Sequence, residues 1–179
     1  MSGASWQIRT ERGEDALQVD ALVTLCFGTG RFAKTAYRLR EGVKADARLC
    51  FVAEENKQLL GAVRFWPILV GGQRSLLLGP LAVQPPLRGR GIGIALMQRG
   101  IEEACKLGFQ TIILVGDESY YSRVGFARLK PDQVSFPGPV NPERILGLAL
   151  QPGALEKLAG AVARAKIDDP VSANAAPLG

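Results

Sequence analysis

The sequence contains no histidine, the residue most often used as a general base and as a zinc ligand. Cysteine is also scarce: Cys26, Cys50 and Cys105 are odd in number, widely spaced and each set among apolar residues. We therefore expect reduced thiols in the core and neither disulfides nor a metal site. Any proton transfer must use Asp, Glu, Tyr, Cys, Lys or water, and no metal cofactor is expected.

Long apolar runs are missing as well. No stretch approaches the roughly 20 residues that a membrane helix needs, and residues 1–12 lack the apolar core and cleavage site of a signal peptide. We therefore expect a cytoplasmic protein without a membrane partner. The net charge of +5 is spread along the chain, so it favours small anionic ligands only weakly and predicts no nucleic-acid partner.

The 179 residues, 47% of them hydrophobic, are enough for one domain with a sizeable core. We place this domain at residues 1–167 and expect a frayed tail at 168–179, which has turn residues and no periodicity. Apolar periodicity predicts strands at 6–10, 48–54, 59–66, 75–83, 111–115, 125–129 and 144–150. It predicts helices at 13–26, 32–40, 117–123 and 153–167, and a central helix that follows Pro85-Pro86 and stops at Gly108.

The order of these elements is typical of an α+β domain with a mixed sheet. Asn56-Lys57 and Gly71-Gly72 are hairpin signals, so the second to fourth strands should form an antiparallel meander. The expected core face of the first helix comprises Leu17, Val19, Leu22, Val23, Leu25 and Cys26. The expected core face of the central helix comprises Leu96, Met97, Gly100, Ile101, Ala104, Cys105 and Gly108.

Three glycines, Gly89, Gly91 and Gly93, lie in a loop between a predicted strand and the central helix. Without Cβ atoms this backbone can approach a phosphate closely, and the first N–H groups of the helix point toward the phosphate with the positive end of the dipole behind them. Arg88 and Arg90 add positive charge at the rim. The pattern indicates a phosphate site, although the same glycines could simply form a tight turn.

Two other phosphate motifs compete with this interpretation. A dinucleotide-binding fingerprint fails because Ile94 or Leu96 stands at its third glycine and because the preceding strand ends a meander. Segment 28–35 is one residue away from a Walker A loop, with Ala33 at the second glycine, and residues 21–27 could form the strand before it. A nucleotide-binding P-loop therefore stays as a remote alternative.

Two landmarks resemble the GNAT superfamily of N-acetyltransferases. Loop 88–93 matches its signature of Arg or Gln, two residues, Gly, one residue, Gly or Ala, and segment 120–126 carries a Tyr four residues before Gly-Phe. Together with the sequence of residues 78–83, these two landmarks are most similar to the bacterial group of N-acetyltransferases that resemble YhbS. The resemblance is strongest over 48–129 and implies the GNAT fold, a twisted, mostly antiparallel sheet flanked by helices.

The resemblance also implies an acetyl-CoA-dependent N-acetyltransferase. Tyr121 would protonate the departing CoA thiolate, since a tyrosine keeps its proton at neutral pH. The main-chain N–H of Leu81 would stabilise the oxyanion formed on the thioester carbonyl. The residues expected to hold acetyl-CoA are Leu81, Ala82, Val83, Arg88, Gly89, Arg90, Gly91, Ile92 and Gly93. The acceptor would be the primary amine of a small molecule or peptide, attacking directly in a ternary complex, and a homodimer is compatible with the family.

Three questions stay open at this level. Glu54, Glu55, Asp117 and Glu118 are candidate general bases, but each can equally be a solvated surface carboxylate. The acceptor pocket is expected to be built largely by segment 27–40, whose mixture of aromatic and basic residues does not identify the substrate. A non-catalytic module that senses acyl-CoA would need the same glycine loop without a catalytic tyrosine.

Overall fold

The computed structural model describes residues 5–30 and 34–165. Its strands are β1 (Gln7–Thr10), β2 (Cys50–Glu55), β3 (Gln58–Val70), β4 (Gln73–Val83), β5 (Thr111–Val115), β6 (Ala127–Arg128), β7 (Val134–Ser135), β8 (Ile145–Ala149) and β9 (Gly160–Arg164). Its α-helices are α1 (Ala16–Phe27), α2 (Thr35–Arg38), α3 (Ile92–Lys106), α4 (Glu118–Tyr121) and α5 (Ala154–Lys157). The predicted tail at 168–179 lies outside the described residues.

The strands form a mixed sheet in the order β1-β2-β3-β4-β5-β8-β6, and β9 joins the far half of β3 and also pairs with the short β7. Within the described chain, only β4 with β5 and β7 with β9 pair in parallel. The two predicted hairpin turns adopt positive φ, at Asn56-Lys57 and at Gly71-Gly72. The predicted α+β architecture with a mostly antiparallel sheet is therefore confirmed.

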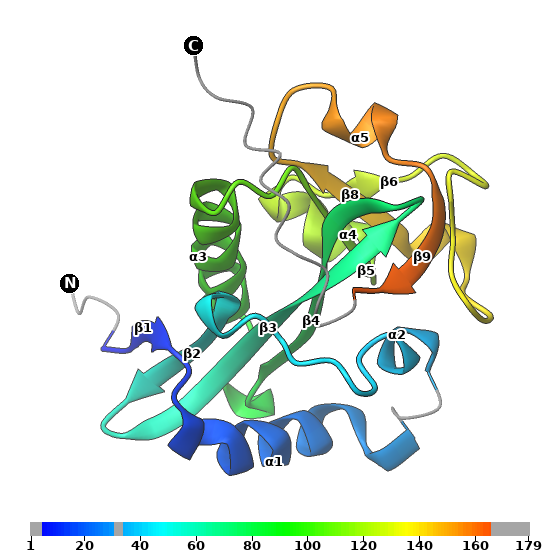
Figure 1. Ribbon diagram of the computed structural model, residues 1–179. Coiled ribbons are helices and arrows are strands. Elements are labelled where there is room, and N and C mark those ends of the chain that lie inside the picture. Colours follow the sequence, from blue (N-terminus) through cyan, green and yellow to red (C-terminus); the bar gives the residue numbers. More distant parts are fainter. Residues whose placement is uncertain (1–4, 31–33, 166–179) are drawn as a thin grey trace.

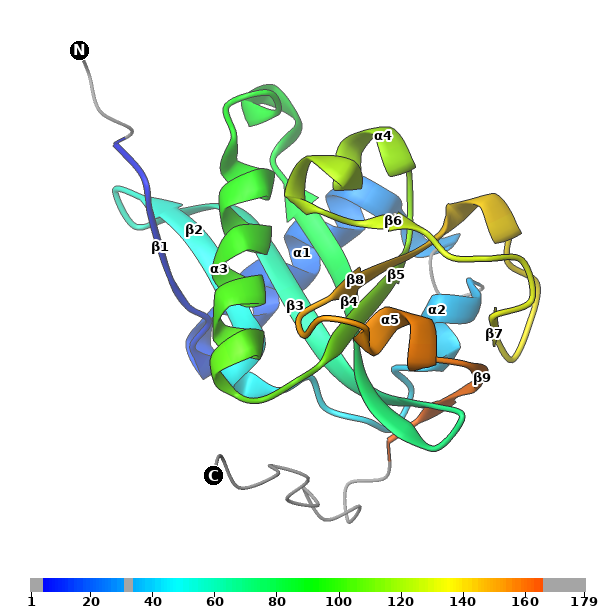
Figure 2. The same cartoon turned by 90° about the horizontal axis from the view of Figure 1, so that it is seen from above.

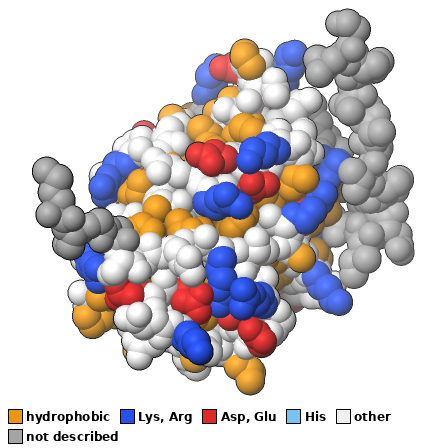
Figure 3. Space-filling view, turned by 90° about the vertical axis from the view of Figure 1, so that its left-hand side faces the viewer, with side chains coloured by type: hydrophobic (Ala, Val, Ile, Leu, Met, Phe, Trp, Pro, Cys, Tyr) orange, Lys and Arg blue, Asp and Glu red, His pale blue; other side chains and the backbone are white. Residues whose placement is uncertain are grey.

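Helices cover both faces of the sheet (Figures 1 and 2). On one face, α3 packs Leu96 and Met97 against a core that includes Phe51 and Phe65. On the other face, α1 packs against β2, β3 and the end of β4, and α2 lies beside it, over the second half of β3 and the first half of β4. On the face shown in Figure 3, basic and acidic side chains are interspersed. Among the described helices, none combines the length and the apolar character that a membrane span requires.

The central strands β4 and β5 are paired over a short length only. Leu76 pairs with Ile112 and Leu77 with Ile113, and the buried hydroxyls of Ser75 and Thr111 lie 2.7 Å apart at the base of this contact. Beyond Leu77, β4 continues to Val83 beside β3 alone. A bulge lies in this part of β4, because two residues lie between Leu78 and Leu81 while only one lies between their partners Phe65 and Val63 on β3. The two strands therefore part, as the chain continues toward the glycine loop.

The prediction of a helix over 153–167 is wrong. Within its described part, 153–165, Ala154–Lys157 alone is helical, and Gly160–Arg164 forms strand β9. The φ of +118° at Gly160 does not fit a helix, and Val162 is buried where β9 pairs with β3. Tertiary pairing of an open sheet edge has overridden a helical pattern in the sequence.

Three further expectations need correction. In α1, Leu17 and Leu25 are 83% and 66% exposed, because the buried stripe is narrower than the apolar content of the helix. Cys105 is exposed on α3 and is not a core thiol, whereas Cys50 is buried. Residues 21–27 belong to α1, so the Walker A reading lacks its preceding strand.

The contact between α3 and β3 yields a test of the packing. A Cβ on Gly100 would collide with the fully buried ring of Phe65. Alanine usually stabilises a helix relative to glycine by about 1 kcal/mol, but overpacking here should reverse the sign. We expect Gly100→Ala to lower the free energy of unfolding in urea by about 1–3 kcal/mol. The exposed control Gln98→Ala should change it by less than about 0.5 kcal/mol; a Gly100→Ala protein more stable than the parent would contradict this packing.

Candidate functional site

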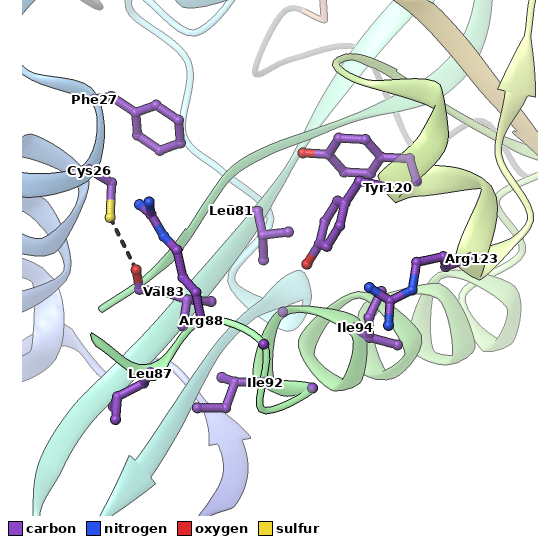
Figure 4. A pocket seen from close by; sticks show the side chains of 14 residues that line it. Cys26, Phe27, Leu81, Val83, Leu87, Arg88, Ile92, Ile94, Tyr120 and Arg123 are labelled. Atoms are coloured by element: carbon purple, nitrogen blue, oxygen red, sulfur yellow. Dashed lines mark hydrogen bonds between the residues drawn. The ribbon is translucent and has the colours of Figure 1, made fainter. Parts of the chain in front are cut away.

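A cleft of about 290 Å³ opens where β4 parts from β5. Four segments build it: the end of α1, the end of β4, the loop leading into α3, and α4 with the turn after it. Cys26 and Phe27 lie on one side, Tyr120 and Arg123 on the other, and Leu81 between them (Figure 4). The lining residues are Cys26, Phe27, Leu81, Val83, Leu87, Arg88, Gly89, Gly91, Ile92, Gly93, Ile94, Tyr120, Tyr121 and Arg123.

The start of α3 has a backbone geometry that can bind an anion. Gly89 and Gly91 have φ of +85° and +82°, a region that L side chains rarely adopt. The Ala95 N–H donates to the Gly91 carbonyl, so the N–H groups of the first helical residues precede the hydrogen-bond ladder and have no carbonyl within the helix. No heavy atom of a non-adjacent residue lies within 4 Å of where a Cβ would stand on Gly89 or Gly91. These N–H groups, at the positive end of the helix dipole, can therefore be reached by a phosphate.

Two arginines add positive charge to the cleft. Arg88 comes from the glycine loop, and Arg123 comes from the turn after α4 on the opposite side (Figure 4). The Arg123 guanidinium lies 5.8 Å from the centre of the Tyr120 ring, a cation–π distance. Both arginines are exposed, so water compensates their charges until an anion binds.

The main chain at the end of β4 faces the cleft. The Gln84 N–H donates to the Leu60 carbonyl on the β3 side. Since hydrogen-bonding directions alternate along an antiparallel strand, the main-chain groups of Val83 and Leu81 point away from β3. The carbonyl of Val83 accepts a weak hydrogen bond from Cys26 Sγ at 3.4 Å. The other main-chain groups on this edge are available to a ligand lying along β4.

Both tyrosines of the double-tyrosine motif line the cleft. The hydroxyl of Tyr120 lies against Gly93 at the start of α3, so a Cβ on Gly93 would collide with it. Tyr121 packs against Gly116, with its ring edge-to-face on Tyr120 at 5.1 Å and on Phe126 at 6.2 Å. Burial raises the pKa of Tyr121 to about 12, and burial also raises the pKa of Tyr120. Both phenols therefore keep their protons at neutral pH.

The structure brings most of the predicted site residues together. Two of them do not line the cleft: Ala82 is buried and pairs with Ala62 of β3, and Arg90 is exposed on the loop. Cleft residues outside the predicted set include Cys26, Leu87 and Arg123. Their positions depend on how α1 and the turn after α4 fold over β4, and no local motif in the sequence marks that.

None of the four carboxylates considered as general bases lines the cleft. Glu54 pairs with Arg9 at 2.8 Å, and the hydrogen bond from Arg9 lowers the pKa of Glu54, which weakens it as a base. Glu55 lies beside Glu54 at the β2–β3 turn, away from the cleft. The two remaining candidates are held in ion pairs on the surface, Asp117 with Arg144 and Glu118 with Arg128. Among the described residues no cluster of His, Cys, Asp or Glu could hold a metal ion.

Comparison with known proteins identifies relatives of this chain. The model of the acetyltransferase (GNAT) family matches residues 17–135. The uncharacterized N-acetyltransferase YhbS of Escherichia coli K12 is 34% identical over 121 residues, covering 66% of this chain and 72% of YhbS. The uncharacterized N-acetyltransferase YjhQ of the same organism is 30% identical over 129 residues, covering 70% of this chain and 71% of YjhQ.

Two solved structures extend the similarity to the fold. The crystal structure of YhbS from Escherichia coli in complex with CoA matches with a TM-score of 0.76, 27% identity and coverage of 92% of each chain. A GNAT acetyltransferase from Brucella melitensis in complex with acetyl-CoA matches with a TM-score of 0.65 and 30% identity, over 89% of this chain and 96% of that one. With the family model spanning most of the sheet and the whole cleft, the chain belongs to the GNAT family of acetyltransferases.

Proposed function

We propose that the chain is an N-acetyltransferase that transfers the acetyl group of acetyl-CoA to a primary amine. The observation that carries this proposal is one cleft that joins the open start of α3, the free main-chain edge of β4 and a buried tyrosine. The relatives support it, since structures of YhbS and of the Brucella enzyme contain CoA and acetyl-CoA, respectively. Each of the three features serves a different part of an acyl-CoA substrate.

In this proposal the pyrophosphate binds the N–H groups of Gly89–Gly93, with Arg88 as a direct charge partner and Arg90 as a more distant one. The open space beside Gly89 and Gly91 fits such a group. The pantetheine arm runs along β4, where Val83 and Leu81 offer main-chain groups, and Ala82 contributes by fixing the strand to β3. The thioester then lies near Leu81, whose N–H stabilises the developing oxyanion.

The chemical step is a direct acyl transfer. The amine nitrogen attacks the acetyl carbon, a C–N bond forms, and the C–S bond breaks as the electron pair returns to sulfur. Tyr121 donates its hydroxyl proton to the CoA thiolate, and the proton lost by the amine passes to water, because no carboxylate among the described residues lines the cleft. Protonation of tyrosinate by solvent restores the enzyme.

The alternative from a different class is a module that binds acyl-CoA and regulates a partner without turnover. Such a module needs the same glycine loop and the same β4 edge, so binding alone does not separate the two functions. Release of free CoA thiol in the presence of amines does separate them. A chain that binds acetyl-CoA and releases no thiol with amino acids, polyamines, aminoglycosides or peptide N-termini would be a sensor.

The glycine loop can be tested by ligand-induced stabilisation. Millimolar acetyl-CoA should raise the thermal midpoint of the wild type, because it binds only the folded state. Gly91→Val should abolish this shift, since valine cannot keep the φ of +82° that presents the N–H groups. The matched control is Gly108→Val, at φ +83° beyond the other end of α3.

Both substitutions impose a similar backbone cost and should lower the midpoint without ligand. Only Gly108→Val should retain the acetyl-CoA shift. A wild-type midpoint that acetyl-CoA leaves unmoved would refute the central proposal, and a shift produced by ATP with magnesium instead would favour the P-loop alternative.

The assignment of the acid predicts unequal effects at the two tyrosines. Adjacent helical residues point about 100° apart, so only one can face the thioester sulfur. Tyr121→Phe should lower kcat about 10²- to 10⁴-fold, with acetyl-CoA affinity nearly unchanged. Tyr120→Phe should affect kcat much less. Thiol-release kinetics and calorimetric titration of CoA on both variants check this, and a reversed order of the two effects would move the acid to Tyr120.

The pH dependence gives an independent check on Tyr121. Its pKa is raised by burial to about 12, so the phenol stays protonated and able to donate throughout the range from pH 7 to about 10. The ratio of kcat between wild type and Tyr121→Phe should therefore be constant across this range. If the ratio collapses toward one as the pH rises to about 9, the phenol loses its proton earlier than its burial implies, and the role of acid fails.

A further inference from the structure

Arg40, which follows α2, carries a charge that no carboxylate among the described residues balances. Its guanidinium lies 5.2 Å from the Tyr37 ring and 5.7 Å from the Trp66 ring. Its Nε is buried without a hydrogen-bond partner, and no ion pair or side-chain hydrogen bond joins Arg40 to the rest of the described chain. In contrast, two other partly buried arginines, Arg9 and Arg64, each form an ion pair with a carboxylate.

An unpaired guanidinium in this position is unfavourable for the free protein. Burial lowers the pKa of Arg40 to about 10, and the charge of Arg64 adds to the effect, yet Arg40 remains cationic at neutral pH. The two rings lie at cation–π distances from the guanidinium, and no described side chain accepts a hydrogen bond from its N–H groups. Such a group is a preformed partner for an anion, and the described chain does not supply that anion.

Arg40 lies at the point where β4 leaves β5. Its Nη2 is 2.9 Å from the position that a Cβ on Gly79 would occupy, and Gly79 is the second residue after the last pairing with β5. Trp66 Nε1 donates to the Gly79 carbonyl at 2.6 Å, which fixes the indole beside the guanidinium. Leu81, where the thioester is proposed to lie, is two residues further along β4, across the bulge, and two residues span at most about 7 Å.

The approach is from the face that α2 covers, opposite α3 and its glycine loop (Figure 2). An anion at Arg40 and the CoA pyrophosphate therefore reach the thioester region from opposite faces of the sheet. This geometry matches two substrates that meet across the opening between β4 and β5.

We propose that Arg40 binds a carboxylate of the acceptor, so that the acceptor is a small amino acid-like amine with its carboxylate only a few bonds from the amino group. The inference rests on the proposed transferase function for the reaction of the amine. A single guanidinium balances the single charge of a carboxylate, which it can hold through two parallel hydrogen bonds. The short distance to Leu81 disfavours peptides, whose amine and terminal carboxylate lie far apart, and polyamines carry no anion.

The experiment compares the common L-amino acids with their C-terminal amides, which keep the amine and lose the carboxylate. Thiol release from acetyl-CoA measures turnover, and the thermal midpoint of the protein saturated with CoA measures acceptor binding. For the preferred side chain, the acid should exceed its amide by about 10- to 100-fold in kcat/KM, the range expected for a charged hydrogen-bonded pair. The same acid should raise the midpoint of the CoA complex, and its amide should not.

Arg40→Met should remove the preference for the acid while acetyl-CoA binding and turnover of the amide persist. Because the change deletes an uncompensated charge, we expect no loss of thermal stability. Arg40→Lys keeps the charge without the bidentate geometry and should retain part of the preference. The matched control is Arg74→Met, another arginine stacked on an aromatic ring, 5.0 Å from Phe109, but exposed and at the far end of β4; it should keep the full preference.

Failure of this inference differs from failure of the proposed function. Equal use of acids and amides by the wild type, or an acid preference that survives in Arg40→Met, would overturn the role of Arg40 and leave the transferase intact. If no amine releases thiol, the transferase proposal fails, and the thermal midpoint still decides: stabilisation by an amino acid in the wild type but not in Arg40→Met supports the anion site, and its absence overturns it.

Discussion

The candidate site is organised by the parting of β4 from β5 after Leu77. Main-chain N–H and C=O groups away from water need partners, and a central strand normally finds them on both sides. Here β4 has β3 on one side only from Leu78 to Val83, and the bulge before Leu81 turns this stretch away from its former neighbour. Within the described chain, two side chains donate to these groups: Trp66 Nε1 to the Gly79 carbonyl and the thiol of Cys26 to the Val83 carbonyl. The proposed substrate completes the sheet where the protein leaves it open.

Chain order explains why the chemistry gathers at this opening. The loop leaving β4 leads directly to the start of α3, and α4 begins only a few residues after β5 ends. The proposed phosphate site and the pair of tyrosines are therefore attached to the two strands that separate, one to each. The Ser75–Thr111 contact at the base and the packing of Phe65 under Gly100 hold the strands and α3 in place, so the opening is built into the core.

Features set by local backbone geometry could be predicted from the sequence, and features set by tertiary contacts could not. Gly89 and Gly91 mark their own conformation, which is why the loop and the start of α3 were predictable. Strand β9 was mistaken for a helix because its pairing partner lies about 90 residues earlier, on β3. Leu17 was misplaced because apolar composition does not say how wide the buried stripe of a helix is. Arg40 carries no sequence signal at all, since its isolation results from contacts among α2, β3 and β4.

The arginines near the opening differ in how much free energy is lost when they have no anionic partner. Arg88 and Arg123 are exposed, so water solvates them when the cleft is empty, and the exchange of water for phosphate oxygens changes the free energy only modestly. Such contacts suit a cosubstrate that must enter and leave in every cycle. Arg40 has a buried Nε without a hydrogen-bond partner, so its charge is incompletely compensated until an anion arrives. An amine without a carboxylate would leave the Arg40 charge uncompensated. A site of this kind discriminates mainly through the free energy lost when the wrong ligand leaves a buried polar group unpaired. In the proposed reaction, the residues that bind the cosubstrate and the arginine that selects the acceptor therefore lie on opposite faces of one sheet.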